Sequence, residues 1–176
     1  MKTNSKRRKD IRLATWNVRT LYRTGGLRIT INELRKYKIA IAAIQETRWT
    51  KTTPQAFASN GYNIYTSSQT NKHEFGPAFF VDSKVNHLVT NFTPISERLC
   101  VLRLKGRFFN YSLINIHAPT NDSEGEAKDQ FYEQLERAYS ACPKNDVKLV
   151  MGDAKAKVGR ETALQPTIGR YSLHDN

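Results

Sequence analysis

The alternation of apolar and polar residues divides the first part of the chain into strand-like and helical segments. Residues 11–17 alternate as a strand does, and residues 26–37 place their apolar side chains at helical spacing. Residues 39–44 form a continuous apolar run, which is typical of a strand covered on both faces. This order of strand, helix and strand predicts a parallel pair joined by a right-handed crossover.

The middle of the chain is rich in strand-forming residues and poor in helical spacing. The segments expected to form strands are residues 61–66, 76–81, 87–92, 98–104 and 108–116. The last two segments flank Lys105-Gly106-Arg107, a short glycine-containing turn, and therefore predict a β-hairpin. We expect this region to be mostly antiparallel.

Helical spacing returns after Ser123, which forms a capping box with Glu126. The expected buried face of this second helix carries Phe131, Leu135, Ala138 and Tyr139. Pro143 ends the helix, because proline cannot continue it. The apolar run at residues 147–151 then predicts a buried strand that brings Asp153 to the rim of a sheet.

Strands dominate and helices stand near both ends, so the predicted class is α/β, with two packed sheets and helices outside. We expect residues 1–10 to form a basic, flexible terminus and residues 11–176 to form one domain, with no internal repeat. The run Lys6-Arg7-Arg8-Lys9 is typical of a nuclear-import signal or a solvated terminus, and the second interpretation is favoured.

Charge adds a partner to this picture. The chain has 28 Lys and Arg against 16 Asp and Glu, a net charge of +12, which favours a polyanion such as nucleic acid over a merely solubilising surface. Cys100 and Cys142 lack the spacing of a zinc site or a disulfide framework, which predicts reduced thiols and an intracellular protein. No apolar run reaches the roughly 20 residues of a membrane span. The oligomeric state is not predicted.

Four predicted strands end in polar residues: Asn17, Glu46, His117 and Asp153. Together they suit metal-assisted hydrolysis of a phosphodiester, because Mg²⁺, or Mn²⁺ in its place, binds carboxylate oxygen and neutralises phosphoryl charge. A second carboxylate can activate water, and an imidazole or amide can hold a nonbridging oxygen. Taken singly, Glu46 and Asp153 are equally typical of solvated acids at strand ends. Asn17 is more typical of a turn residue, and His117 of a packed or surface histidine.

Basic residues around these strand ends are candidates for a phosphate track. The predicted nucleic-acid-binding residues are Arg48, Lys155 and Lys157, with Lys51 and Arg160 as further members. Scattered surface charge is the alternative for all of them. Trp49 is a candidate for base stacking, although packing against the core is the favoured interpretation.

The four strand ends lie in segments whose order resembles the endonuclease/exonuclease/phosphatase family. These segments are Leu13-Ala14-Thr15-Trp16-Asn17-Val18-Arg19, Ile44-Gln45-Glu46-Thr47-Arg48-Trp49, Asn115-Ile116-His117-Ala118-Pro119-Thr120 and Met151-Gly152-Asp153. The resemblance implies a metal-dependent phosphoesterase with a DNase I-like two-sheet sandwich. It is greatest for the apurinic-type endonuclease branch found in non-LTR retrotransposons, and it runs from about residue 11 to the end.

The resemblance also implies roles for individual residues. Glu46 matches the family's metal-binding glutamate, and Asn17 matches the amide beside the metal and the phosphate. His117 stands where family members carry Tyr or His near the scissile phosphate. Asp153 matches the aspartate that activates water.

The chain departs from the family pattern in two places. Lys155 replaces the asparagine two residues after the aspartate, and a cation there should lower the basicity of Asp153. The family continues with further strands and ends in an Asp-His pair that this chain lacks; His174-Asp175 has the reverse order and is expected to lie in a loop. We therefore expect a sandwich that is incomplete at its C-terminus, with an uncovered sheet edge.

The leading hypothesis is a retroelement-derived, Mg²⁺-dependent DNA endonuclease whose activity is impaired by Lys155 and by the missing pair. One alternative is a catalytically inactive relic that binds nucleic acid. Another is a different phosphoesterase of the same family, acting on inositol phosphates or sphingolipid. For the leading hypothesis, a nuclear location is favoured over a cytoplasmic one.

Overall fold

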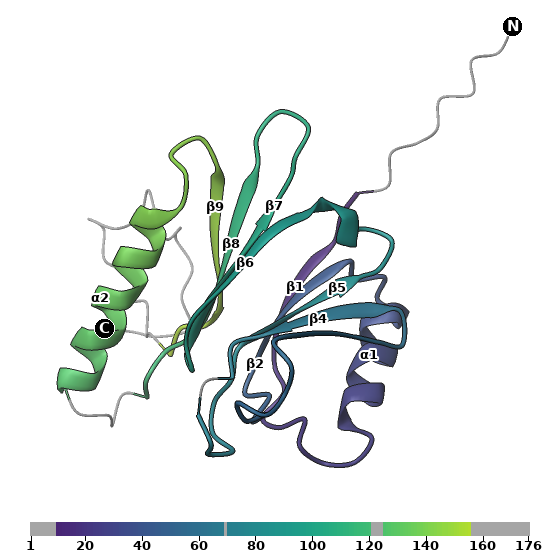
Figure 1. The fold of residues 1–176 in the computed structure, drawn as a ribbon, viewed down its shortest axis with the longest axis horizontal. Coiled ribbons are helices and arrows are strands. Elements are labelled where there is room, and N and C mark those ends of the chain that lie inside the picture. The colour runs from purple at the N-terminus through teal and green to yellow at the C-terminus, as the bar shows by residue number, and fades with distance from the viewer. Residues whose placement is uncertain (1–9, 69, 121–124, 156–176) are drawn as a thin grey trace, which may run out of the picture.

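Two β-sheets pack face to face, with one helix on the outer face of each (Figure 1). The computed structural model describes residues 10–68, 70–120 and 125–155. In chain order, the helices and strands of these residues are β1 (Leu13–Asn17), α1 (Gly26–Lys36), β2 (Ile41–Gln45), β3 (Ala56–Ser59), β4 (Tyr62–Thr66), β5 (Ala78–Asp82), the 3₁₀ turn η1 (Asn86–Leu88), β6 (Val89–Ser96), β7 (Leu99–Leu104), β8 (Tyr111–His117), α2 (Gly125–Ala141) and β9 (Val147–Asp153).

The first sheet has the strand order β1-β2-β5-β4-β3. The predicted parallel pair is confirmed, since β1 and β2 run parallel while the other neighbours are antiparallel. All five residues of β2 are buried, as the continuous apolar run predicts. Helix α1 covers the outer face of this sheet through Ile31 and Leu34, which pack in one core cluster with Ala42, Ile44 and Phe80.

The second sheet has the order β6-β7-β8-β9, and the predicted antiparallel pairing of β7 with β8 is confirmed. The predicted start of the second strand is wrong, because β8 begins at Tyr111 and residues 108–110 lie in the connecting loop. Its inner face packs Cys100, Leu102 and Leu113 against Ile41 and Phe79 of the first sheet. Helix α2 covers its outer face through Phe131 and Ala138, and α2 ends before Pro143 as expected. The class predicted from the sequence, a two-sheet α/β sandwich with helices outside, is therefore confirmed.

The prediction that residues 147–151 form a buried strand is wrong. Among the described residues, strand β9 is the edge of its sheet and pairs only with β8, in parallel. The side chains of Val147, Leu149 and Val150 are consequently 39%, 37% and 46% exposed. An apolar run of this length fits a central strand and an edge strand equally well, because the pattern does not reveal how many neighbours a strand has.

One side chain and one strand also differ from the sequence prediction, and three predicted features lie outside the described residues. Tyr139 lies on the exposed side of α2, at 46% exposure, and not on the buried face predicted for it. Strand β3 was not predicted, because its short Ala-Phe-Ala-Ser sequence carries a weak strand signal. Ser123 of the expected capping box, the basic run at residues 6–9 and His174-Asp175 lie outside the described residues.

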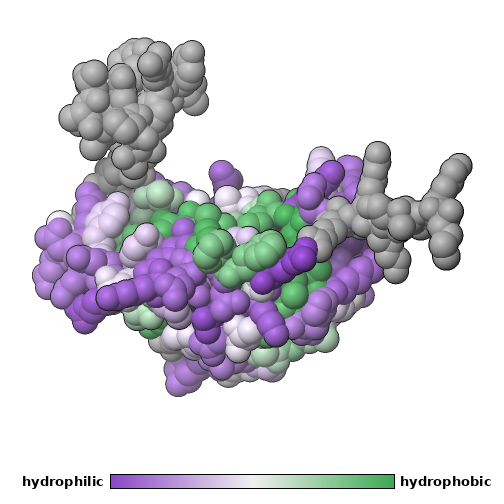
Figure 2. Space-filling view, turned by 90° about the horizontal axis from the view of Figure 1, so that it is seen from above, coloured by the Kyte–Doolittle hydropathy of each residue, from purple (hydrophilic) through white to green (hydrophobic). Residues whose placement is uncertain are grey.

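The surface of the sandwich is uneven in polarity. Viewed from above, hydrophobic residues gather near the middle of the face and hydrophilic residues surround them (Figure 2). This is the end from which the connection between β7 and β8 projects in Figure 1. Among the described residues, none of the helices has the length and apolar character that crossing a membrane requires.

Candidate active site

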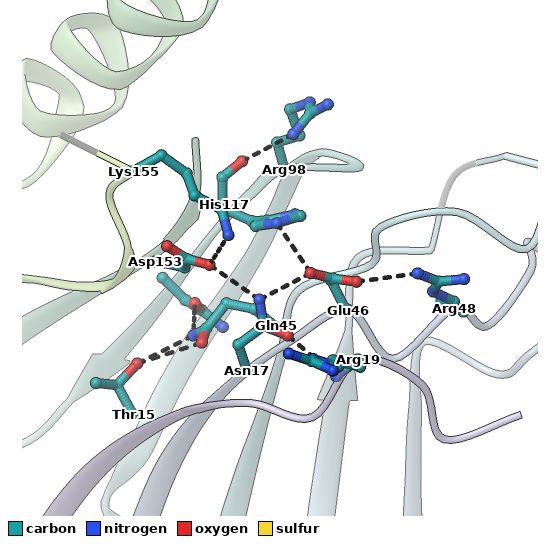
Figure 3. Close-up of polar contacts among 11 residues, drawn as sticks. Thr15, Asn17, Arg19, Gln45, Glu46, Arg48, Arg98, His117, Asp153 and Lys155 are labelled. Atoms are coloured by element: carbon teal, nitrogen blue, oxygen red, sulfur yellow. Dashed lines mark hydrogen bonds and ion pairs between the residues drawn. The ribbon is translucent and has the colours of Figure 1, made fainter. Parts of the chain in front are cut away.

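The four predicted strand-end residues meet at one edge of the sandwich (Figure 3). Asn17 ends β1, Glu46 follows β2, His117 ends β8 and Asp153 ends β9. Because β1 runs parallel to β2 and β8 runs parallel to β9, the carboxyl end of each pair points to a single edge of its sheet. The packing of the two sheets then brings both pairs together.

Asn17 connects the two sheets at this edge. Its Nδ2 donates to Glu46 Oε1 at 2.8 Å and to Asp153 Oδ2 at 2.9 Å. Its Oδ1 accepts a hydrogen bond from the backbone N–H of Arg19 at 3.0 Å, which fixes the orientation of the amide. One side chain of the first sheet therefore holds two carboxylates, one from each sheet, within reach of the same small region.

Glu46 sits in a left-handed backbone conformation, with φ of 56°. Such a conformation costs a non-glycine residue of order 1–3 kcal/mol and is enriched at functional sites. Its Oε2 lies 3.2 Å from Arg48 Nη2, and its Oε1 lies 3.4 Å from His117 Nε2. Burial alone would raise the pKa of Glu46, but the hydrogen bonds from Asn17 and Arg48 bring it below its ordinary value.

Asp153 forms an ion pair with Lys155, whose Nζ lies 2.5 Å from Asp153 Oδ2. Lys155 has a left-handed backbone, with φ of 51°, which turns its side chain back toward the carboxylate. Burial would raise the pKa of Asp153, but the hydrogen bonds from Lys155 and Asn17 lower it. The expectation that a cation reduces the basicity of this carboxylate agrees with the geometry.

His117 is buried, with 5% of its surface exposed. Burial is the main reason that its pKa is lowered, and the nearby Arg98 adds to this effect, while the charge of Glu46 opposes it. Burial therefore favours the neutral form of the imidazole. Its Nδ1 has no hydrogen-bond partner among the described residues, and its Nε2 faces Glu46.

Arg98 is a site residue that the sequence did not reveal. Its Nη1 donates to the carbonyl oxygen of His117 at 3.2 Å, and its guanidinium lies over the ring of Phe75 at 3.8 Å. The ring of Phe75 in turn lies 5.8 Å from that of His117. A hollow of about 380 Å³ opens here, lined by Glu46, Arg48, Glu74, Phe75, Arg98, His117, Ala118, Thr120 and Lys155.

Two buried amides support the site from below. Gln45 Nε2 donates to Asn115 Oδ1 at 2.7 Å and to Thr15 Oγ1 at 3.1 Å. Asn115 Nδ2 donates to the backbone carbonyls of Ile44 and Ala78, at 3.0 and 2.9 Å. The network joins β1, β2, β5 and β8 directly behind Glu46 and His117. Sequence reasoning missed it, although an amide next to the apolar residues of each strand was a usable signal.

The oxygen atoms at this edge suit a hard divalent cation only in part. Glu46 and Asp153 offer carboxylate oxygens, and Mg²⁺ in proteins commonly takes one or two carboxylates and completes its shell with water. Each carboxylate is already paired with a cation, Arg48 or Lys155. Within the described residues there is no cluster of three or more His, Cys, Asp or Glu side chains that would hold a metal by themselves.

The residues predicted to bind nucleic acid fall into three groups. Arg48 and Lys155 line the hollow beside the carboxylates. Lys157 and Arg160 lie outside the described residues, and Lys51 is exposed in the loop after β2. Trp49 packs against Phe57 and Phe80 in the core of the first sheet, so the structure favours packing over base stacking for this residue.

The sequence model of the Endonuclease/Exonuclease/phosphatase family matches residues 14–154, and the chain belongs to this family. Craniofacial development protein 2 of Bos taurus is 30% identical over 161 residues, which are 92% of this chain and 26% of that protein. The chain thus spans about a quarter of the length of this relative.

Solved structures share the fold at low sequence identity. An AP endonuclease from Archaeoglobus fulgidus matches with a TM-score of 0.61 and 21% identity, over 89% of this chain and 63% of that one. The endonuclease domain of TRAS1, a telomere-specific non-LTR retrotransposon, matches with a TM-score of 0.59 and 21% identity, over 85% of this chain and 61% of that one. The 3′ phosphatase NExo from Neisseria, bound to a product DNA hairpin, matches with a TM-score of 0.64 and 17% identity, over 88% of this chain and 60% of that one.

Proposed function

We propose that the site hydrolyses phosphodiester bonds of DNA with the help of Mg²⁺, and that Lys155 impairs this activity in the present chain. The observation that carries the proposal is the bridge formed by Asn17, which holds Glu46 and Asp153 within 3 Å of one amide nitrogen. Phosphodiester hydrolysis in general fits the family to which the chain belongs. DNA and Mg²⁺ are the finer parts of the proposal.

DNA is favoured as the substrate by charge and by similarity. The net charge of +12 suits a polyanion, and Arg48 and Arg98 place guanidinium groups at the hollow. One solved structure with the same fold holds a DNA hairpin, and another is a retrotransposon endonuclease domain. Inositol phosphates and sphingolipid remain alternative substrates within the family, and no feature of the hollow favours them.

The residues divide the chemistry among them. Glu46 would hold Mg²⁺, which supplies charge neutralisation on the phosphoryl oxygens and on the leaving oxygen. Asp153 accepts a proton from the water molecule that attacks phosphorus. As the new bond to phosphorus forms, the bond to the leaving oxygen breaks with its electron pair, and that oxygen takes a proton from solvent water. Neutral His117 donates from Nε2 to a nonbridging oxygen, while Arg98 offers its charge to the same phosphate.

Lys155 opposes the role of Asp153. A carboxylate with a lowered pKa is a weaker base, and its ion pair with Lys155 must open before Asp153 can take a proton from water. The same contact favours a second candidate function, in which the site binds nucleic acid without cutting it. In that case Lys155, Arg48 and Arg98 serve as phosphate contacts.

A plasmid-nicking assay tests the first proposal. Supercoiled DNA is incubated with Mg²⁺ and with the chain, its Lys155→Asn variant, and Lys155→Asn combined with Glu46→Ala. We expect the unaltered chain to nick DNA slowly and Lys155→Asn to nick it roughly tenfold faster or more. Adding Glu46→Ala to Lys155→Asn should lower the nicking rate by at least about 100-fold. Glu133→Ala is the matched control, because this exposed acid on α2 lies away from the site.

Two results would contradict the proposal. If Lys155→Asn does not nick DNA under any Mg²⁺ or Mn²⁺ concentration, hydrolysis of DNA is not the function of this site. If the unaltered chain nicks as fast as Lys155→Asn, then Lys155 does not impair it. Salt-sensitive binding of duplex DNA in a gel shift, without nicking by any variant, would establish the binding-only alternative.

A further inference from the structure

The loop between β7 and β8 lies at the opposite end of the sandwich from the carboxylates. Strand β8 begins at Tyr111, beside this loop, and ends at His117 in the candidate active site. At about 3.3 Å per residue, the length of β8 separates the two places by roughly 20 Å. This end of the molecule is the one on which hydrophobic residues gather in Figure 2.

The loop is held in one shape by its own contacts. The backbone N–H of Gly106 donates to Asn110 Oδ1 at 3.2 Å, and the carbonyl of Asn110 accepts from the N–H of Val147 at 2.8 Å. A Cβ atom on Gly106 would overlap the carbonyl of Phe109, so the close turn requires glycine at this position. The tip of the loop is therefore preorganised, which reduces the entropy lost when a ligand binds.

The tip presents two phenyl rings to solvent. Phe108 is 80% exposed and Phe109 is 62% exposed. The guanidinium of Arg107 lies over the ring of Phe108 at 5.0 Å, and Lys105 is exposed on the same loop. These two adjacent phenylalanines do not pack in the core. Contiguous exposed apolar surface of this kind is typical of a binding site.

A hollow of about 430 Å³ lies beside the two rings. It is lined by Arg103, Phe108, Phe109, Asn110, Pro143, Lys144, Asn145 and Asp146. Asp146, the acidic residue of this lining, is buried and accepts from Arg103 at 2.7 Å and from Ser112 at 2.8 Å, so its charge is compensated inside the protein. The exposed charged residues of this region are basic: Lys144 lines the hollow, and Lys105 and Arg107 lie on the adjoining loop.

We propose that this loop and hollow form a second nucleic-acid site, which binds single strands. Bases that are not paired stack on Phe108 and Phe109, and phosphates contact Lys105, Arg107 and Lys144. The aromatic rings suit the π-faces of all four bases, and the basic residues follow the backbone, which is the combination used for single strands. The site is separate from the carboxylates and does not depend on hydrolysis there.

The charges distinguish this ligand from a protein segment. A peptide would bury the rings in apolar side chains and would need acidic residues to match three cations, whereas a single strand carries a ring and a negative charge in every nucleotide. Stacking on planar rings at 80% and 62% exposure needs no deep pocket, and the hollow is open to solvent. Contact with another protein is the alternative outcome of the experiment.

The test measures fluorescence anisotropy of a labelled 15-nucleotide single strand, in EDTA so that hydrolysis cannot occur. We expect the Phe108→Ala/Phe109→Ala double variant to weaken binding by about 10- to 100-fold, because each stacked base contributes substantially to affinity. In Lys105→Ala/Arg107→Ala, the slope of log binding constant against log salt concentration should become shallower by about 0.7 for each lost phosphate contact. Tyr132→Ala, which removes a 49% exposed ring from α2, should leave the affinity within about twofold.

A second measurement locates the strand directly. A single strand containing 5-iodouracil is photo-crosslinked, and we expect mass spectrometry to find the adduct on Phe108 or Phe109. Thermal unfolding checks that the fold is intact in Phe108→Ala/Phe109→Ala. We expect an unchanged melting temperature, because both rings are exposed. An unchanged affinity, or adducts confined to the candidate active site, would overturn the proposal. Loss of self-association in the double variant with unchanged affinity would instead assign the surface to a protein contact.

The outcomes separate this inference from the proposed nuclease. If no variant nicks DNA but binding of single strands still depends on Phe108 and Phe109, the second site stands while the nuclease proposal fails. If Lys155→Asn nicks a short duplex and the double variant binds single strands normally, the reverse holds. Nicking of a short duplex by Lys155→Asn should change less than about twofold when both phenylalanines are also replaced.

Discussion

Glu46 and Asp153 are arranged alike in sequence but are supported differently. Glu46 follows β2 and Asp153 ends β9, and each of these strands runs parallel to one neighbouring strand. Each acid has a cation two residues later, Arg48 or Lys155. Both cations have left-handed backbones, with φ of 57° and 51°. The turn after each strand therefore directs a basic side chain back onto the carboxylate that precedes it.

The strands that carry the two acids are not equivalent. Strand β2 lies between β1 and β5 and is wholly buried, and Gln45 ties it to the second sheet. Within residues 10–155 as the structure describes them, strand β9 has one neighbour, β8, and three of its apolar side chains are exposed. The strand before Glu46 is consequently held from both sides, whereas Asp153 is held by one ladder of hydrogen bonds, by the bridge from Asn17 and by its ion pair with Lys155.

Among the substitutions that test this difference between the two strands, Gly152→Ala is expected to have the largest effect on stability. Gly152 has φ of 141° and lies opposite Ile116, whose carbonyl oxygen a Cβ atom would overlap. Strand β9 must move away from β8, and Asp153 moves with it. We expect a loss of about 2–4 kcal/mol in the free energy of unfolding, measured in urea, together with loss of any nicking activity.

Gly25→Ala is the matched control for that experiment. Gly25 also has a positive φ, 85°, but a Cβ atom there would meet no other atom within 4 Å. The substitution should cost only about 1 kcal/mol, from backbone strain alone. Equal losses in the two variants would show that the contact between Gly152 and Ile116 is unimportant and that β9 is not the weaker half.

The next largest effect is expected on the Glu46 side, from Gln45→Met. The substitution keeps the shape of the side chain but removes the donor to Asn115 Oδ1 in the core. We expect a loss of about 1–3 kcal/mol in thermal or urea unfolding, the penalty for a buried polar atom without a partner. Thr15→Val removes a weaker contact of the same amide and should cost less than about 1 kcal/mol.

Affinity for a divalent cation sharpens the comparison of the two ion pairs. Lys155 lies closer to its carboxylate than Arg48 does, at 2.5 against 3.2 Å, and is less exposed, at 32% against 46%. We expect Lys155→Asn to raise Mn²⁺ affinity about tenfold, and Arg48→Gln about twofold, because the nearer and more buried cation competes more strongly. Calorimetric titration measures both, and a larger gain from Arg48→Gln would contradict this ranking.

The smallest expected effect concerns acid pH. The pKa values of Glu46 and Asp153 are lowered in the folded chain, so each carboxylate adds stability above its unfolded pKa of about 4. That stability is lost as pH falls through the folded pKa. Lys155→Asn should raise the pKa of Asp153 and reduce the loss between pH 5 and pH 2 by less than about 1 kcal/mol, measured by urea unfolding.

The fold and the four central site residues were predictable from local patterns. Asn17, Glu46, His117 and Asp153 each end or follow an apolar segment, and the order of the segments is that of the family to which the chain belongs. The parallel pairing of β1 with β2 follows from the helix between them. These features depend on residues near one another in the sequence or on a motif.

The remaining features depend on which strands become neighbours in space. Arg98 precedes β7, and antiparallel pairing places it at the same edge as His117, so a search of strand ends alone does not find it. The exposure of β9 follows from its place at the edge of the sheet, which its apolar sequence does not encode. The contact between Gln45 and Asn115 joins residues 70 positions apart across two sheets.

The hydrogen bond from Asn17 to Asp153 joins residues separated by 136 positions. The first sheet is built from residues 13–82 alone, so a growing polypeptide can complete it on the ribosome long before β9 is translated. Glu46 is then in place without its partner acid. The two carboxylates are thus brought together last. If the proposed hydrolysis is correct, a nascent chain that has not yet formed β9 lacks the second acid of the site.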